Sequence, residues 1–159
     1  MKSNEFEKLI DKNKYQVFLF SSPVPIPLNF AIHTWFVINL KGKIHRWEFG
    51  SFRGSPHPNG IGVLKDFLEP TKGMNFYWWK ANPRFDSKLI SFIEGNDKSI
   101  AKDLALFIEK NSNKYPLKNT YKLLGPNSNS FMSWILEKFP NSKLKLPFNA
   151  FGKNYKVSE

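Results

Sequence analysis

The sequence contains no cysteine. That absence excludes a disulfide framework, a thiolate zinc site and a cysteine nucleophile. Acidic residues are also few, 13 against 24 lysines and arginines, so the net charge is +11. Only three of these basic residues are arginines, and the lysines are spread along the chain. Specific nucleic-acid readers favour arginine forks, so we interpret the charge as a solvated surface with salt-sensitive attraction to nucleic acid or an anionic membrane.

No long uninterrupted apolar run is present. The least polar window, residues 17–40, is broken by prolines and contains His33, so we expect no transmembrane helix. Residues 1–14 are charged throughout and lack an apolar signal core, which makes a cytoplasmic location the default expectation. At 159 residues and 41% hydrophobic content, the chain is expected to fold as one domain spanning residues 1–159. Residues 1–13 are expected to form a short helix or a loose arm.

Apolar periodicity predicts a mixture of strands and helices without regular βαβ alternation. We therefore expect an α+β fold with a mainly antiparallel sheet packed with helices. The expected strands are residues 15–20, 30–40, 44–50 and 74–81, of which 30–40 and 44–50 form a hairpin around Lys41-Gly42-Lys43. The expected helical segments are a turn at 64–69, a short helix at 86–93, a clear helix at 97–111 and a last helix that begins within 127–131.

The start of that last helix is the first candidate site. The run Asn127-Ser128-Asn129-Ser130 directly precedes an apolar helical pattern, as in a helix cap. A helix start also favours a nucleophile or a bound anion, because free N–H groups and the helix dipole converge there. The alternative interpretation is a well-capped helix with no further role.

The histidines form the second candidate group. His33 lies in the middle of an apolar strand, where it could be a general base or a core histidine whose hydrogen bonds are satisfied. His45 follows across the hairpin turn and could be a neighbour of His33. Glu48 could orient a histidine or be a solvated strand residue. His57 is a third histidine, but nothing else in the sequence supports a metal site, so we expect neither metal nor cofactor.

Two segments carry a resemblance to a known family. The stretches FAIHTWFV (residues 30–37) and LLGPNSNSFMSWI (123–135), followed by LPFNAFGKNY (146–155), resemble a bacterial family catalogued as domain of unknown function 3750. That family carries an HTW segment and a GPNSN[T/S]F segment in this order. The resemblance covers most of the chain and implies no activity.

A second resemblance concerns mechanism and fold. Circularly permuted NlpC-type proteins of the papain-like group, including the lecithin retinol acyltransferase family, place a histidine on an early strand and Asn-Cys-x-x-Phe at a later helix start. Residues 127–131 match that late motif with serine in place of cysteine. The resemblance implies a permuted papain-like arrangement in which Ser128 is the nucleophile, His33 its base and His45 the orienting group. Serine is far less ionised than cysteine, so it needs a well-placed base and oxyanion donors, for which Asn127 and Asn129 are candidates.

The sequence thus leaves several functions open. The favoured hypothesis is acyl transfer or amide or ester hydrolysis in a cleft between His33 and Ser128. A second is a non-catalytic module that binds a small molecule, peptide, glycan or lipid in the same cleft, with Trp35, Trp47 and Trp78 at its rim. A third is a basic surface that binds nucleic acid or anionic membrane.

Overall fold

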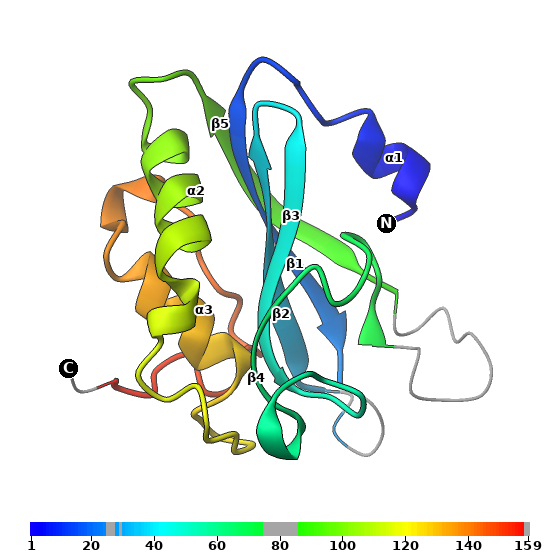
Figure 1. Ribbon diagram of the computed structural model, residues 1–159, viewed down its shortest axis with the longest axis vertical. Helices are drawn as coiled ribbons and strands as arrows, with labels where there is room; N and C mark the ends of the chain where they lie inside the picture. Colours follow the sequence, from blue (N-terminus) through cyan, green and yellow to red (C-terminus); the bar gives the residue numbers. More distant parts are fainter. Residues whose placement is uncertain (25–27, 29, 75–85, 158–159) are drawn as a thin grey trace.

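The computed structural model describes residues 1–24, 28, 30–74 and 86–157. Within these residues, five strands form one antiparallel sheet in the order β4-β3-β2-β1-β5 (Figure 1). The strands are β1 (Tyr15–Pro23), β2 (Ile32–Leu40), β3 (Lys43–Ser51), β4 (Ile61–Lys65) and β5 (Lys88–Gly95). The helices are α1 (Ser3–Glu7), α2 (Ile100–Asn111) and α3 (Ser128–Leu136), with 3-10 turns at Pro58–Gly60, Ser112–Lys114 and Pro140–Ser142. The expected α+β class is confirmed.

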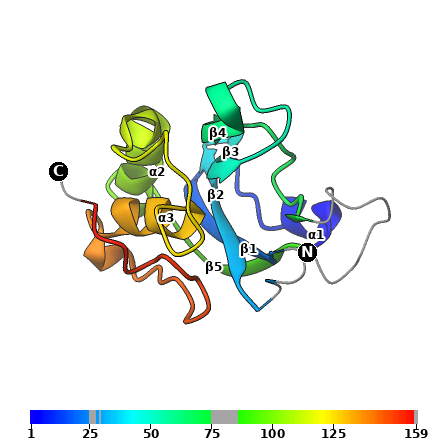
Figure 2. The same ribbon diagram turned by 90° about the horizontal axis from the view of Figure 1, so that it is seen from below.

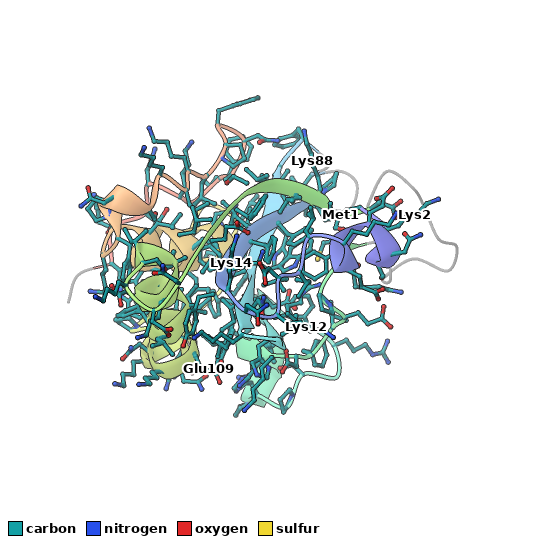
Figure 3. All side chains as sticks on the ribbon, turned by 90° about the horizontal axis from the view of Figure 1, so that it is seen from above. Met1, Lys2, Lys12, Lys14, Lys88 and Glu109 are labelled. Carbon is teal, nitrogen blue, oxygen red and sulfur yellow. The ribbon has the colours of Figure 1, made fainter. Side chains whose placement is uncertain are left out.

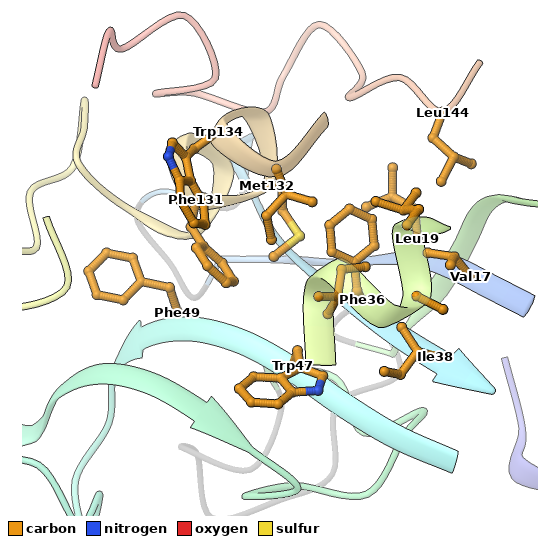
Figure 4. Close-up of a cluster of buried hydrophobic side chains, with 14 of the residues drawn as sticks. Val17, Leu19, Phe36, Ile38, Trp47, Phe49, Phe131, Met132, Trp134 and Leu144 are labelled. Atoms are coloured by element: carbon orange, nitrogen blue, oxygen red, sulfur yellow. The ribbon is translucent and has the colours of Figure 1, made fainter. Parts of the chain in front are cut away.

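The sheet is covered on both faces, as Figure 2 shows from below. Helices α2 and α3 pack on one face, and α1 packs on the other. The larger core lies under α2 and α3 and includes Leu104 of α2. Figure 4 shows Phe36 and Phe49 of the sheet with Phe131 of α3 in this core. The smaller core lies under α1, whose Phe6 packs edge-on against Phe18. Strands β1 and β2 are therefore buried on both faces, which explains their nearly continuous apolar sequence.

The β2–β3 hairpin has the turn that the sequence predicts. Lys41 and Gly42 both have positive φ, 51° and 96°, as a two-residue turn between twisted strands requires. Asn39 supports the turn, since its side-chain oxygen accepts a hydrogen bond from the Gly42 N–H. Alternation along β2 places His33, Trp35 and Val37 on the α1 face.

The sheet is split between β2 and β3 at the end away from this turn. The two strands pair only from Phe36–Leu40 to Lys43–Trp47. Beyond that point the first half of β2 stays paired with β1, while the second half of β3 pairs with β4. Side chains from both strands can therefore meet in the gap between them.

Two local predictions are wrong. Residues 88–95 form the edge strand β5, antiparallel to β1, and not the helix expected at 86–93. Residues 61–65 form the edge strand β4 against β3, which takes the first two residues of the helical turn expected at 64–69, and residues 66–69 are not helical. Both segments are fixed by pairing with strands distant in sequence, which overrides a weak local preference. The strand expected at 74–81 lies outside the described residues apart from Met74. No helix in the described part of the chain is long and apolar enough to cross a membrane.

Candidate functional site

Helix α3 begins in a complete capping box. The Asn127 side-chain oxygen accepts hydrogen bonds from the N–H groups of Asn129 and Ser130, at 3.0 and 3.2 Å. In return the Ser130 hydroxyl accepts a hydrogen bond from the Asn127 N–H at 2.8 Å. The Asn127 amide group also donates to the Phe151 carbonyl, which ties the C-terminal loop to the cap. The structure therefore confirms the predicted helix start and leaves the side chain of Ser128 outside the box.

Asn129 attaches this helix start to β2 on both sides of His33. Its side-chain amide donates to the Ile32 carbonyl at 2.9 Å, and its side-chain oxygen accepts from the Thr34 hydroxyl at 2.7 Å. All three residues are held by bonds with good geometry, and Thr34 and Asn129 are buried. Asn129 thus sets the position of α3 relative to the strand that carries His33.

His33 is held in the split of the sheet by a buried ion-pair network. Its Nε2 lies 2.9 Å from Oε2 of Glu48 on β3. The same carboxylate oxygen accepts a hydrogen bond from Nη2 of Arg46 at 2.9 Å. Nε of Arg46 lies 2.8 Å from the other oxygen, as an ion pair whose angles depart from hydrogen-bond geometry. All three side chains are at most 2% exposed. Glu48 is therefore not a solvated strand residue, the alternative that the sequence left open.

Further contacts fix the Arg46 guanidinium. Its Nη1 donates to the carbonyls of Glu69 and Lys72, at 2.8 and 2.6 Å. Its central carbon lies 4.1 Å from the centre of the Trp35 ring, a cation–π contact. The His33 ring lies between Trp35 and Phe52, with ring centres 5.9 and 5.8 Å away. These contacts leave the imidazole little freedom to rotate.

The charges in this network depend on each other. Burial alone would raise the pKa of Glu48, but attraction from Arg46 and the hydrogen bond from His33 outweigh it and hold that pKa below its ordinary value. Burial lowers the pKa of Arg46, against attraction from Glu48. Glu48 is therefore an anion at neutral pH.

A cavity of about 240 Å³ brings the two predicted groups together. His33 and Ser128 both line it, with Tyr121, Asn127 and Asn129. His33 leaves β2 on the face opposite α3, and the split in the sheet is what gives both residues access to one space. Within the described residues no hydrogen bond joins His33 to Ser128, and Nδ1 of His33 has no hydrogen-bond partner. The remaining wall is apolar: Val24, Leu28, Ala31, Ile32, Leu123 and Phe151.

Tyr121 is the neighbour of Ser128 in this cavity. Burial raises the pKa of the Tyr121 phenol, and its polar neighbour Ser128 opposes that rise. The negative charge of Glu48 raises the pKa further. The phenol is therefore neutral at physiological pH and can donate a proton in a hydrogen bond.

The other predicted site residues lie elsewhere. His45 is opposite Ile38 in the hairpin, and its Nδ1 lies 2.7 Å from Asp66, so the structure does not bring it to His33. Trp35 and Trp47 do not line the cavity: they are core residues whose indole N–H groups donate to the Pro70 carbonyl and to Glu109. Trp78 lies outside the described residues. His57 donates to the Val63 carbonyl, and in the described part of the chain no three His, Asp or Glu side chains form a metal-binding cluster.

Sequence reasoning missed two members of the site, Arg46 and Tyr121, and gave Glu48 only as one of two alternatives. Glu48 occupies the position beside His33 that was expected for His45, and it is fifteen residues from His33 along the chain. Alternation along β3 places Arg46 and Glu48 on the same face, so a basic and an acidic residue two apart in an apolar strand were an available signal. Tyr121 had no such signal, because it reaches the site from a turn before α3.

Tyr115 is a second tyrosine close to α3 but outside the cavity. Its hydroxyl is buried without a hydrogen-bond partner of good geometry. Burial raises its pKa to about 12, although the nearby Ser130 hydroxyl lowers it slightly. The folded state thus favours the neutral phenol, and this contribution to stability is complete below pH ~10 and lost as pH rises toward ~12.

We expect Tyr115→Phe to remove that alkaline loss. At neutral pH the variant should be as stable as the natural protein or more stable by about 1 kcal/mol, because a buried hydroxyl without a partner is removed. Urea unfolding at neutral pH and at pH ~11 measures both effects. A loss of more than ~1 kcal/mol at neutral pH would show that the hydroxyl makes a bond that stabilises the fold.

Comparison with known protein families gives one match. A family model described as "Protein of unknown function (DUF3750)" matches residues 14–155. The matched range contains all five strands, α2 and α3, and every residue of the cavity and of the His33–Glu48–Arg46 network. Comparisons with curated proteins and with solved structures gave no match.

Proposed function

The chain belongs to the family DUF3750, whose description assigns no activity, and from the site we propose acyl chemistry at Ser128. The proposed reaction is hydrolysis or transfer at an ester or amide, with Ser128 as nucleophile and His33 as general base. One observation carries the proposal. The Nε2 atom of His33 is bound to a buried, anionic Glu48, and the ring lines the same cavity as the Ser128 hydroxyl. A base oriented by a carboxylate next to a hydroxyl is the arrangement that activates serine.

The reaction would proceed in two balanced halves. The Ser128 oxygen attacks the carbonyl carbon of the substrate, and the hydroxyl proton moves to Nδ1 of His33. Glu48 stabilises the imidazolium that forms. The intermediate then expels the alcohol or amine, which takes the proton from His33 and leaves an acyl group on Ser128. Water, activated by the same imidazole, releases the acid, or a second alcohol or amine accepts the acyl group.

Negative charge develops on the carbonyl oxygen during this reaction. Tyr121 is an available donor, since it lines the cavity with Ser128 and its raised pKa keeps the phenol protonated. The side chains of Asn127 and Asn129, proposed earlier for this role, are committed to the cap, to Phe151 and to β2. We therefore assign oxyanion stabilisation to Tyr121 and to backbone N–H groups at the start of α3.

The proposal also agrees with the order of these residues along the chain. A histidine on an early strand, a polar partner on the next strand and a nucleophile at a later helix start follow the permuted NlpC-type papain-like pattern. Glu48 takes the place that the sequence resemblance gave to His45. The serine remains a departure from that pattern, because a serine hydroxyl needs more activation by a base than a cysteine thiolate does. The ionised Glu48, through His33, would supply part of that activation.

Ester turnover tests the proposal with a matched pair of variants. We expect the natural protein to hydrolyse p-nitrophenyl acetate or butyrate faster than buffer. We expect Tyr121→Phe to lower kcat by about 10²-fold, the effect of losing one oxyanion donor. Tyr115→Phe removes the same hydroxyl from a tyrosine outside the cavity and should leave kcat unchanged. Equal effects of the two substitutions, or hydrolysis no faster than buffer, would contradict the assignment.

A second candidate function is binding without turnover. It is favoured by the mainly apolar cavity wall. The ligand would be a small acyl or peptide fragment whose polar end meets His33. Binding of a short fatty acid that survives Ser128→Ala, in a protein that forms no product from the esters, would favour this function over catalysis.

A further inference from the structure

A group of exposed apolar side chains surrounds the mouth of the cavity. Six large ones lie on the loops that approach it, and we call them the mouth face: Phe30, Leu123, Leu124, Phe148, Phe151 and Tyr155. Phe148 is 89% exposed and Leu124 is 73% exposed. Exposed apolar residues scattered singly need no explanation, but a contiguous group around a cavity does.

Contacts among these residues show that the mouth face is contiguous. Leu123 and Phe151 line the cavity itself. Leu124, Phe148, Phe151 and Tyr155 line an adjoining shallow depression. On the other side, the rings of Phe30 and Phe151 meet edge-on with centres 5.8 Å apart. The face therefore joins the start of β2, the loop before α3 and the C-terminal loop, which lie together in Figure 2.

The same part of the chain is strongly basic. Residues 112–157 carry one acidic residue, Glu137, and it is paired with Lys156. The lysines in this range are Lys114, Lys118, Lys122, Lys138, Lys143, Lys145, Lys153 and Lys156. Eight lysines against one glutamate give +7 for residues 112–157, most of the +11 of the whole chain. Lys122 is exposed directly before Leu123, and Lys145 is exposed three residues before Phe148.

We infer that the mouth face binds the surface of an anionic membrane. Exposed apolar side chains would enter the headgroup region, and the surrounding lysines would contact negatively charged lipid headgroups. A nucleic acid would use the lysines but would leave Leu124 and Phe148 without a partner. A second copy of the chain would bring two basic faces together, which opposes association. An anionic lipid surface matches both the charge and the apolar side chains.

Binding to vesicles tests this inference. We expect the full chain to co-sediment with vesicles of equal parts phosphatidylcholine and phosphatidylglycerol, and to stay in solution with phosphatidylcholine alone. Raising the salt concentration should weaken binding, because lysine–headgroup attraction is screened. We expect Leu124→Ser/Phe148→Ser and, separately, Lys122→Glu/Lys145→Glu each to lower the partition coefficient by about tenfold or more.

Control variants carry the same chemical changes away from the mouth face. Lys12→Glu/Lys43→Glu alters two exposed lysines at the hairpin end, where Figure 3 shows Lys12. Phe92→Ser alters an exposed phenylalanine of β5. Circular dichroism checks that each variant is folded. We expect both controls to retain most of the binding.

Three results would overturn the inference. They are no binding to the anionic vesicles, binding that the mouth-face and control variants weaken equally, and binding to duplex DNA with none to vesicles. The inference goes beyond the acyl chemistry and does not depend on it. Ser128→Ala should leave vesicle binding unchanged, so failure of one proposal can be told from failure of the other.

Discussion

Glu48→Gln should lower the free energy of unfolding by about 3–5 kcal/mol, the cost of leaving a buried charge without its partner. The substitution keeps the size of the side chain but removes the negative charge that Arg46 contacts through two nitrogens. Burial prevents water from replacing that contact, because Arg46 is fully buried under Trp35 and the carbonyls of Glu69 and Lys72. Urea unfolding at neutral pH measures the loss.

A double substitution separates the ion pair from the packing around it. We expect Arg46→Met/Glu48→Leu to be more stable than Glu48→Gln alone, because no unpaired charge remains. Glu94→Gln is the control, since Glu94 pairs with Lys14 at a more exposed position, where ion pairs contribute little. A loss below ~1 kcal/mol for Glu48→Gln would show that the network is not a buried ion pair in solution.

The same pair also predicts the response to acid. The pKa of Glu48 is held below its ordinary value in the folded protein. Its contribution to stability is therefore complete above the unfolded pKa, near ~4.3, and is lost as the pH falls through the lower folded value. The natural protein should accordingly lose stability more steeply in acid than Glu48→Gln does.

The second large effect concerns turnover. Ser128→Ala should lower kcat for the p-nitrophenyl esters by at least about 10³-fold, because the attacking oxygen is absent. Ser133→Ala, on the same helix but outside the cavity, is the matched control and should retain full activity. His33→Gln should have an effect similar to that of Ser128→Ala.

The double variant distinguishes one catalytic unit from two independent contributions. Residues that act together in one step are strongly non-additive, so His33→Gln/Ser128→Ala should be no slower than the slower single variant. Multiplication of the two single effects would show that His33 acts independently of Ser128. Retained turnover in Ser128→Ala would contradict the nucleophile assignment.

Local signals in the sequence were sufficient for several elements. The strand and turn residues of the β2–β3 hairpin, the apolar stripe of α2 and the Asn127 cap all lie within a few residues of the structures they specify. The α+β class followed from these elements. Local signals do not contain the pairing between distant segments. Both wrong predictions concern segments that form the edge strands β4 and β5 by such pairing.

The candidate site divides in the same way. His33 and Ser128 were identified from their own neighbourhoods, and they line one cavity. The partner of His33 depended on register, which pairs His45 with Ile38 and leaves Glu48 free to reach across the split. Trp35 and Trp47 were expected at the rim of the cleft, because tryptophan is common both in ligand sites and in cores. Their burial, which only the three-dimensional structure shows, makes them core residues.

A fluorophosphonate reagent tests the central claim most directly, because it forms a stable bond only with an activated serine. We expect mass spectrometry to find one phosphonyl group, carried by Ser128, and we expect His33→Gln to prevent the labelling. Absence of label on the folded protein, or label that persists unchanged in His33→Gln, would contradict an activated Ser128–His33 site.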